Sequence, residues 1–171
     1  IFLLGACYFE IKNFDLSKEF LSKFLEYEPN HSTANYILGL IYKFKRDYKN
    51  SFLFFERAYR NEKNNLDIVS NFSINLIKAK MYDKAEKLLL ESIENFKTNY
   101  ILYNRLGYLY FETGQTQKCI QYYNQALDIE KKNLEAYCNL GNSYLRNSEL
   151  SSAKKIFERG LKIFPNSKDI Q

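Results

Sequence analysis

The glycines of this 171-residue chain recur with a fixed period. Four of the six stand 34, 68 and 34 residues apart, at Gly5, Gly39, Gly107 and Gly141, and Ser73 stands at the missing position of the series. A large apolar residue precedes each of the five positions, a small side chain follows it by twelve residues and a large apolar one by sixteen. A period held without insertion indicates a tandem array of one small supersecondary unit.

The spacing within the period predicts two helices per repeat. At about 100° per residue, the glycine, the residue before it and the residue three later share one helical face, and the small and large rows share one face of a second helix. A glycine in a helix costs about 1 kcal/mol of propensity, which close approach of the paired helix would offset. Turn residues such as Asn13-Phe14-Asp15 and Thr113-Gly114-Gln115 separate the helices. Six glycines and two prolines are too few for a β-sandwich or barrel, so we expect an all-α fold.

The row of Leu-Gly-x-x-Tyr, small, aromatic, small and Pro residues resembles the tetratricopeptide repeat. The resemblance implies an α-solenoid, a right-handed superhelix of helix-turn-helix repeats, with a non-repeating helical bundle as the alternative. It makes residues 1–171 a single array, divided into repeats 1–31, 32–65, 66–99, 100–133 and 134–167, with 168–171 beginning a further or capping helix after an N-cap at Asn166 or Ser167. Because neither end supplies a complete capping repeat, we expect a segment of a longer protein.

The sequence offers little for catalysis. Its one histidine, His31, falls in a connection, where we expect it to be solvated, and phosphate-binding glycine motifs and Cys/His clusters are absent from the sequence. Cys119 belongs to the small row and should be a buried thiol, whereas Cys138 faces the predicted inner surface. We therefore expect a protein that is not an enzyme, has no cofactor or metal, and is cytoplasmic. The alternative is a bacterial envelope lipoprotein, because Leu4-Gly5-Ala6-Cys7 is similar to a lipobox.

The resemblance places the first helix of each repeat along a concave inner surface. Two residues before the glycine position stand Asn71, Arg105 and Asn139, a row similar to the asparagine ladder of the O-linked N-acetylglucosamine transferases. Amides offer a donor and an acceptor and could hold the backbone of an extended peptide. The predicted peptide-binding groove comprises Tyr36, Lys43, Phe44, Asn71, Asn75, Lys78, Asn104, Arg105, Tyr108, Asn139, Asn142 and Arg146.

The cochaperone branch of the family provides a comparison for this groove. Its carboxylate clamp uses Lys and Asn, then Asn, then Lys and Arg, to bind an acidic C-terminal tail. The corresponding residues here are Tyr36, Leu40, Asn71, Ile101 and Arg105, and two of the five match. Without the lysines we do not expect capture of a terminal carboxylate.

The net charge of +5 is concentrated in the second repeat, which carries seven basic and three acidic residues. This patch lacks a continuous stripe, so RNA binding is kept only as an alternative. The sequence predicts a non-enzymatic scaffold that binds an extended or helical protein segment within a multiprotein complex. Two further alternatives remain open: the recognition arm of an enzyme such as a glycosyltransferase, and an envelope lipoprotein in secretion or pilus assembly. The oligomeric state is left open.

Overall fold

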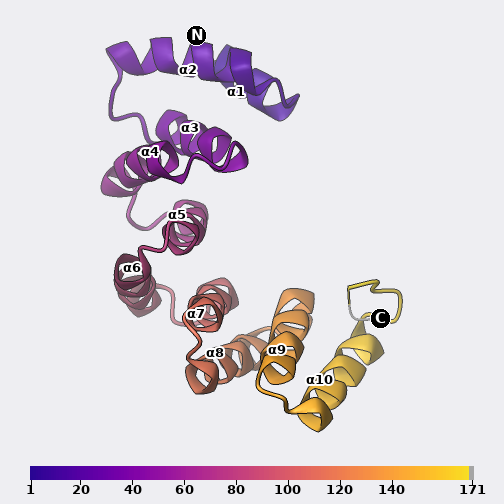
Figure 1. The fold of residues 1–171 in the computed structure, drawn as a ribbon. Coiled ribbons are helices and arrows are strands. Elements are labelled where there is room, and N and C mark those ends of the chain that lie inside the picture. The colour runs from indigo at the N-terminus through magenta and orange to yellow at the C-terminus, as the bar shows by residue number, and fades with distance from the viewer. Residues whose placement is uncertain (170–171) are drawn as a thin grey trace. The chain divides into compact units, whose positions relative to one another are not determined.

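The computed structural model describes residues 1–169, and this part of the chain folds into ten α-helices without a strand. Short connections join successive helices (Figure 1), as the sequence predicts. The helices are α1 (Phe2–Glu10), α2 (Phe14–Tyr27), α3 (Ser32–Phe44), α4 (Tyr48–Asn61), α5 (Leu66–Lys78), α6 (Tyr82–Asn95), α7 (Tyr100–Glu112), α8 (Thr116–Ile129), α9 (Leu134–Arg146) and α10 (Leu150–Ile163). Each predicted repeat contains two of them, which confirms the all-α expectation.

The chain divides into two compact units. Unit 1 runs from Ile1 to Met81 and holds α1–α5, and unit 2 begins at Tyr82 and holds α6–α10. The division falls inside the third predicted repeat, between its two helices. That the whole chain forms one array stays a prediction.

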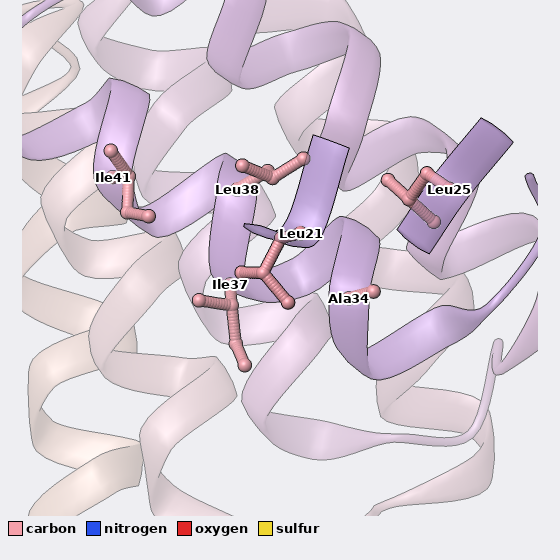
Figure 2. Packing of buried hydrophobic residues seen from close by; sticks show 6 residues of the cluster. All are labelled: Leu21, Leu25, Ala34, Ile37, Leu38 and Ile41. Atoms are coloured by element: carbon pink, nitrogen blue, oxygen red, sulfur yellow. The ribbon is translucent and has the colours of Figure 1, made fainter. Parts of the chain in front are cut away.

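One core cluster of unit 1 lies between α2 and α3. Buried Ala34, Leu38 and Ile41 of α3 are spaced four and three residues apart, as in the apolar stripe of an amphipathic helix. Partly buried aromatic rings from α1 and α2, including Phe2, Phe9 and Phe24, extend this core. The six side chains drawn in Figure 2 are Leu21, Leu25, Ala34, Ile37, Leu38 and Ile41.

The core of unit 2 follows the same rows of the repeat. Its helices α7, α8 and α9 pack against one another through side chains that are almost completely buried. The small row of α8 is filled by Cys119, which confirms the predicted buried thiol. The central members are Leu102, Leu106, Leu109, Cys119, Tyr123, Ala126, Ala136 and Leu140.

The repeat glycines lie where paired helices cross. A Cβ atom added to Gly39 would stand 2.7 Å from the Phe55 ring, and one on Gly107 would stand 2.7 Å from the Tyr123 ring. The helices approach so closely that the Ser51 hydroxyl donates to the Gly39 carbonyl oxygen at 2.8 Å. The paired helices thus approach closely at the glycines, as the sequence predicts, and the residue that fills this space comes from the large row sixteen residues later.

The turn inside each repeat has the same backbone conformation. The residue seven positions after the glycine has a positive φ, between 58° and 74°, in all five repeats. The N–H groups of this residue and of the next one donate hydrogen bonds to carbonyl oxygens of the preceding helix, which is a Schellman motif. In the first repeat Lys12 donates to Phe9 and Asn13 donates to Tyr8. The five residues in this left-handed conformation are Lys12, Arg46, Lys80, Gly114 and Ser148.

Residues 165–169 form turns after the end of α10. That residues 168–171 begin a further or capping helix stays a prediction. Residues 170–171, the rest of the predicted helix, lie outside the described part of the chain. Within residues 1–169, no helix combines the length and apolar character that a membrane span requires.

Candidate functional site

Three of the predicted groove residues converge in unit 1. Tyr36 and Lys43 stand seven residues apart on one face of α3, and Asn71 of α5 reaches both. The Asn71 amide donates to the Tyr36 hydroxyl at 2.8 Å, and the Lys43 ammonium donates to the Asn71 carbonyl oxygen at 2.5 Å. Burial, with the Asp67 carboxylate nearby, raises the pKa of Tyr36, so its phenol is neutral at physiological pH. We call Tyr36, Lys43 and Asn71 the polar cluster.

An exposed aromatic ring lies beside the polar cluster. Phe44 is 57% exposed although it is a large apolar side chain, and its ring stacks on Phe14 with 5.3 Å between centroids. The Lys43 ammonium lies 6.0 Å from the centroid of the Phe44 ring. Unit 1 therefore presents hydrogen-bonding groups and apolar surface side by side, which is the combination that peptide segments use.

The predicted residues of unit 2 are held by contacts within that unit. Arg105 of α7 forms an ion pair with Glu135 of α9, with 2.6 Å between Nη1 and Oε1, and its side chain is only 15% exposed. Arg146 donates to the Phe111 carbonyl oxygen at 2.5 Å, and its guanidinium lies 4.8 Å from the centroid of that ring. The ion pair engages the guanidinium through which Arg105, as a member of the row with Asn71 and Asn139, was expected to hold a peptide.

The other groove residues differ in exposure. Tyr108 and Asn139 are half-buried, whereas Asn142 and Lys78 are exposed. Because Asn71 belongs to unit 1 and Arg105 and Asn139 belong to unit 2, the three-residue ladder as one peptide track stays a prediction.

The groove prediction is wrong for two residues. Asn75 and Asn104 are 0% and 1% exposed, so neither can meet a ligand on the surface. The Asn75 amide donates to the Tyr48 carbonyl oxygen at 3.2 Å. The Asn104 amide donates at 3.3 Å to the side chain of Asn133, which caps α9. These amides face neighbouring helices and satisfy backbone or cap groups there, a role that their polarity alone did not reveal.

His31 was expected to be solvated, and this expectation is wrong. Its Nδ1 accepts a hydrogen bond from the Ala34 N–H at 3.2 Å, and its ring packs between Phe2 and Phe24 with centroids 4.6 Å and 5.0 Å away. The period contained the signal, because the residue eight positions before the glycine also caps its helix in the next three repeats. Those caps are Asn65, Asn99 and Asn133.

Two of the cysteines lie in surroundings that disfavour a reactive thiolate. Burial raises the pKa of the Cys119 and Cys138 thiols, which disfavours the thiolate that nucleophilic chemistry needs. The Cys119 sulfur lies 3.0 Å from the Ser143 hydroxyl, inside the core. Among residues 1–169, no group of three or more His, Cys, Asp and Glu side chains could hold a metal ion.

Comparisons with curated proteins identify partial relatives. An uncharacterized ycf37 protein of Pyropia yezoensis is 37% identical over 67 residues, which are 39% of this chain and 38% of that protein. The Hsp70-Hsp90 organising protein of Plasmodium falciparum is 29% identical over 90 residues, which are 53% of this chain and 36% of that protein. The chain thus spans less than two fifths of the length of these relatives.

Solved structures share the fold at low sequence identity. MamA from Desulfovibrio magneticus is 18% identical, with a TM-score of 0.82 over 96% of this chain and 93% of its own. PilW, a type IV pilus biogenesis factor, is 15% identical, with a TM-score of 0.85 over 98% of this chain and 77% of its own. YrrB, a TPR protein with an unusual peptide-binding site, is 19% identical, with a TM-score of 0.73 over 97% and 86%.

Two family models match the sequence directly. The model described as tetratricopeptide repeat matches residues 1–31, 32–65 and 134–167, whose bounds are those of three repeats deduced from the glycine period. A second, described as TPR repeat, matches residues 99–148. The matched ranges do not include residues 66–98, the region in which Ser73 replaces the repeat glycine. With ten helices within residues 1–169 and a shared fold, the chain is an all-α solenoid that belongs to the tetratricopeptide repeat family.

Proposed function

We propose that the chain is a non-enzymatic protein-interaction scaffold, which binds an extended or helical segment of a partner protein along the first helices of its repeats. Membership of a family built from stacked repeats supports a role in surface display. One relative is named as an organising protein of Hsp70 and Hsp90, and one structural neighbour, YrrB, has an unusual peptide-binding site.

The polar cluster beside Phe44 is the observation that carries this proposal. The Asn71 amide donates to the Tyr36 hydroxyl and the Asp67 carbonyl oxygen, and its own oxygen, which has two lone pairs, accepts from Lys43. A peptide N–H can donate to the Asn71 oxygen, and the Lys43 charge can attract a peptide carbonyl, while an apolar side chain of the partner covers Phe44. Such a contact recognises backbone together with one apolar residue.

In unit 2, the proposed contacts come from the exposed side of α9. Asn142 is open to solvent, and Arg146 keeps donors beyond the one that bonds Phe111. Arg105 acts by fixing Glu135 rather than by meeting the partner. A terminal carboxylate is not the proposed ligand, because Tyr36 and Leu40 stand where the cochaperone clamp has lysine and asparagine.

The test removes the polar cluster and measures binding to a partner. Partners are first captured from cells of the source organism, and the segment that binds is then titrated against purified protein. The variant Lys43→Ala with Asn71→Ala should weaken that binding by about tenfold or more, because two central polar contacts are lost. The pair Asn142→Ala with Arg146→Ala tests unit 2 in the same way.

A matched control separates the surface from a general effect. Lys23→Ala with Asn61→Ala also removes one lysine and one asparagine, both exposed on second helices. All variants must retain the helicity of the wild type. If the control and the two surface variants bind the segment equally well, the first helices are not the binding surface and the proposal is wrong.

A further inference from the structure

Positive charge in unit 1 is collected on the edge formed by its turns. The edge consists of residues 10–15 and 44–49, which stand five to ten positions after a repeat glycine, and of residues 78–81, the part of the third such segment that belongs to unit 1. We call it the turn edge. It carries six basic and three acidic residues, whereas the rest of unit 1 carries six of each. The whole excess positive charge of unit 1 therefore lies on the turn edge.

Contacts between helices join the turns into one surface. Lys45 from the second turn forms an ion pair with Asp15 from the first, with 2.7 Å between Nζ and Oδ1. The Asn75 amide, near the third turn, donates to the carbonyl oxygen of Tyr48 in the second. Charges in different turns can thus act on the same ligand.

Two of the three acidic residues on this edge are engaged within the protein. Asp15 is paired with Lys45, and Asp47 accepts hydrogen bonds from the backbone and the side-chain amide of Asn50. The excess positive charge of the edge is carried by its other exposed cations. They include Lys12, Arg46, Lys49 and Lys80, of which three occupy the left-handed turn position.

A hollow of about 500 Å³ opens on the same edge, between the start of α4 and the turn that follows α5. Its lining is mainly apolar, and Lys49 is its charged member. Leu53 at its side is 45% exposed, so apolar surface there faces solvent. The lining residues are Tyr48, Lys49, Phe52, Leu53, Ala79 and Met81.

We propose that the turn edge of unit 1 is a second docking surface, which binds an acidic peptide segment of a partner protein and takes one of its apolar side chains into this hollow. Charge complementarity selects the acidic character, since exposed cations surround an apolar site. The mainly apolar lining, with Lys49 as its one charged member, favours an apolar side chain of a peptide over a nucleic acid, whose binding relies mainly on phosphate contacts. The turn edge shares Phe44 with the site proposed above but does not include the polar cluster, and the inference goes beyond the proposed function.

The left-handed turn positions allow a charge-removing variant that keeps the fold. In Lys12→Gly/Arg46→Gly/Lys80→Gly three charges are lost, while glycine fits the positive φ better than the residues it replaces. The control Lys23→Gln/Arg60→Gln/Lys63→Gln removes the same charge from exposed positions elsewhere in unit 1. Fluorescence anisotropy with a labelled peptide of alternating Glu and Leu provides the measurement.

We expect the glycine variant to bind the Glu-Leu peptide about tenfold more weakly than the wild type, because three exposed charges that attract its carboxylates are lost. The control should bind as the wild type does. Leu53→Glu places a charge beside the hollow, and it should weaken binding of the Glu-Leu peptide more than binding of a Glu-Ser peptide. Asn71→Ala should leave both affinities unchanged.

Three outcomes would overturn the proposal. Equal loss in the glycine variant and the control would mean that net charge alone attracts the peptide. Equal affinity for the Glu-Leu and Glu-Ser peptides would remove the role of the hollow. Tighter binding of a single-stranded oligonucleotide than of the Glu-Leu peptide, abolished by the glycine variant, would assign the edge to nucleic acid instead.

Discussion

Units 1 and 2 close the turns inside their repeats with the same backbone geometry but with different residues. The left-handed position holds Lys12, Arg46 and Lys80 in unit 1, and Gly114 and Ser148 in unit 2. All five turns make the same two hydrogen bonds back to the preceding helix. The turn geometry is therefore a property of the repeat and does not require glycine. A side chain in this conformation costs about 1 kcal/mol or more, so three basic residues there in one unit are consistent with a role for their charge.

The two units also differ at the starts of their second helices. In unit 1, the side chains of Asn13 and Asp47 accept from the first turns of α2 and α4. The corresponding residues of unit 2, Gln115 and Glu149, make no such side-chain bond. Local signals thus stabilise the second helices of unit 1 more directly, and those of unit 2 depend more on packing.

Substitution of the glycines at the helix crossings should give the largest difference in stability between the units. Gly39→Ala is expected to lower the free energy of unfolding by about 1–2 kcal/mol, because overpacking against the fully buried Phe55 outweighs the gain in helix propensity. Gly141→Ala should cost less, because the half-buried Phe157 ring can rotate toward solvent. Urea unfolding of both variants measures this difference. An equal or larger cost at Gly141 would contradict the expectation that burial of the facing ring decides it.

Reciprocal substitutions in the turns should have effects of opposite sign. Arg46→Gly should stabilise the protein by about 1 kcal/mol, since it relieves a left-handed residue. Gly114→Ala should destabilise it by about the same amount. A Cβ atom at Gly114 would have no atom within 4 Å, so the effect there comes from the backbone alone. The shift of the thermal midpoint provides the measurement, and two shifts of the same sign would contradict the argument.

The glycine period was sufficient to predict the helices and their crossings. It anticipated that the paired helices approach closely at the glycines and that Cys119 is buried, because both follow from which rows share a helical face. It failed where a polar side chain has a partner on another helix. Asn75 and Asn104 looked like surface amides, but each donates to a group on a neighbouring element and is buried there.

The candidate site was predicted only in part, for a related reason. Position within a helix gives the direction of a side chain, and this was enough to bring Tyr36, Lys43 and Asn71 onto adjacent surfaces. It does not give the ion pairs between repeats, so Arg105 was interpreted as a free contact although Glu135 holds it. His31 was missed because it was judged by residue type, whereas its place in the period identifies it as a helix cap.

An N-cap residue of unit 1 introduced at the equivalent position of unit 2 should reduce the difference in helix stability between the units. Gln115→Asp places at the start of α8 the acceptor that Asp47 provides at the start of α4, and it should stabilise the protein by about 0.5–1 kcal/mol. Gln115→Glu is the matched control, because it adds the same charge with the longer side chain that stands without a cap bond at Glu149. Equal stabilisation by Asp and Glu, measured by urea unfolding, would assign the gain to the helix dipole rather than to the cap.

The smallest expected effect is a loss of the stability of unit 1 at acidic pH. Hydrogen bonds from the Asn50 side chain and backbone lower the pKa of Asp47, and the hydrogen bond from Lys45 lowers that of Asp15. A pKa below the unfolded value means that the stabilisation is present above about pH 4 and is lost as the pH falls through the lowered value. Both carboxylates reach solvent, which keeps the effect small. Asp47→Asn keeps a cap acceptor without the titration, so its urea midpoint should fall less between neutral and acidic pH than that of the wild type. Asp128→Asn on α8 is the control, and an equally reduced fall in that variant would show that the acid dependence does not arise at the cap of α4.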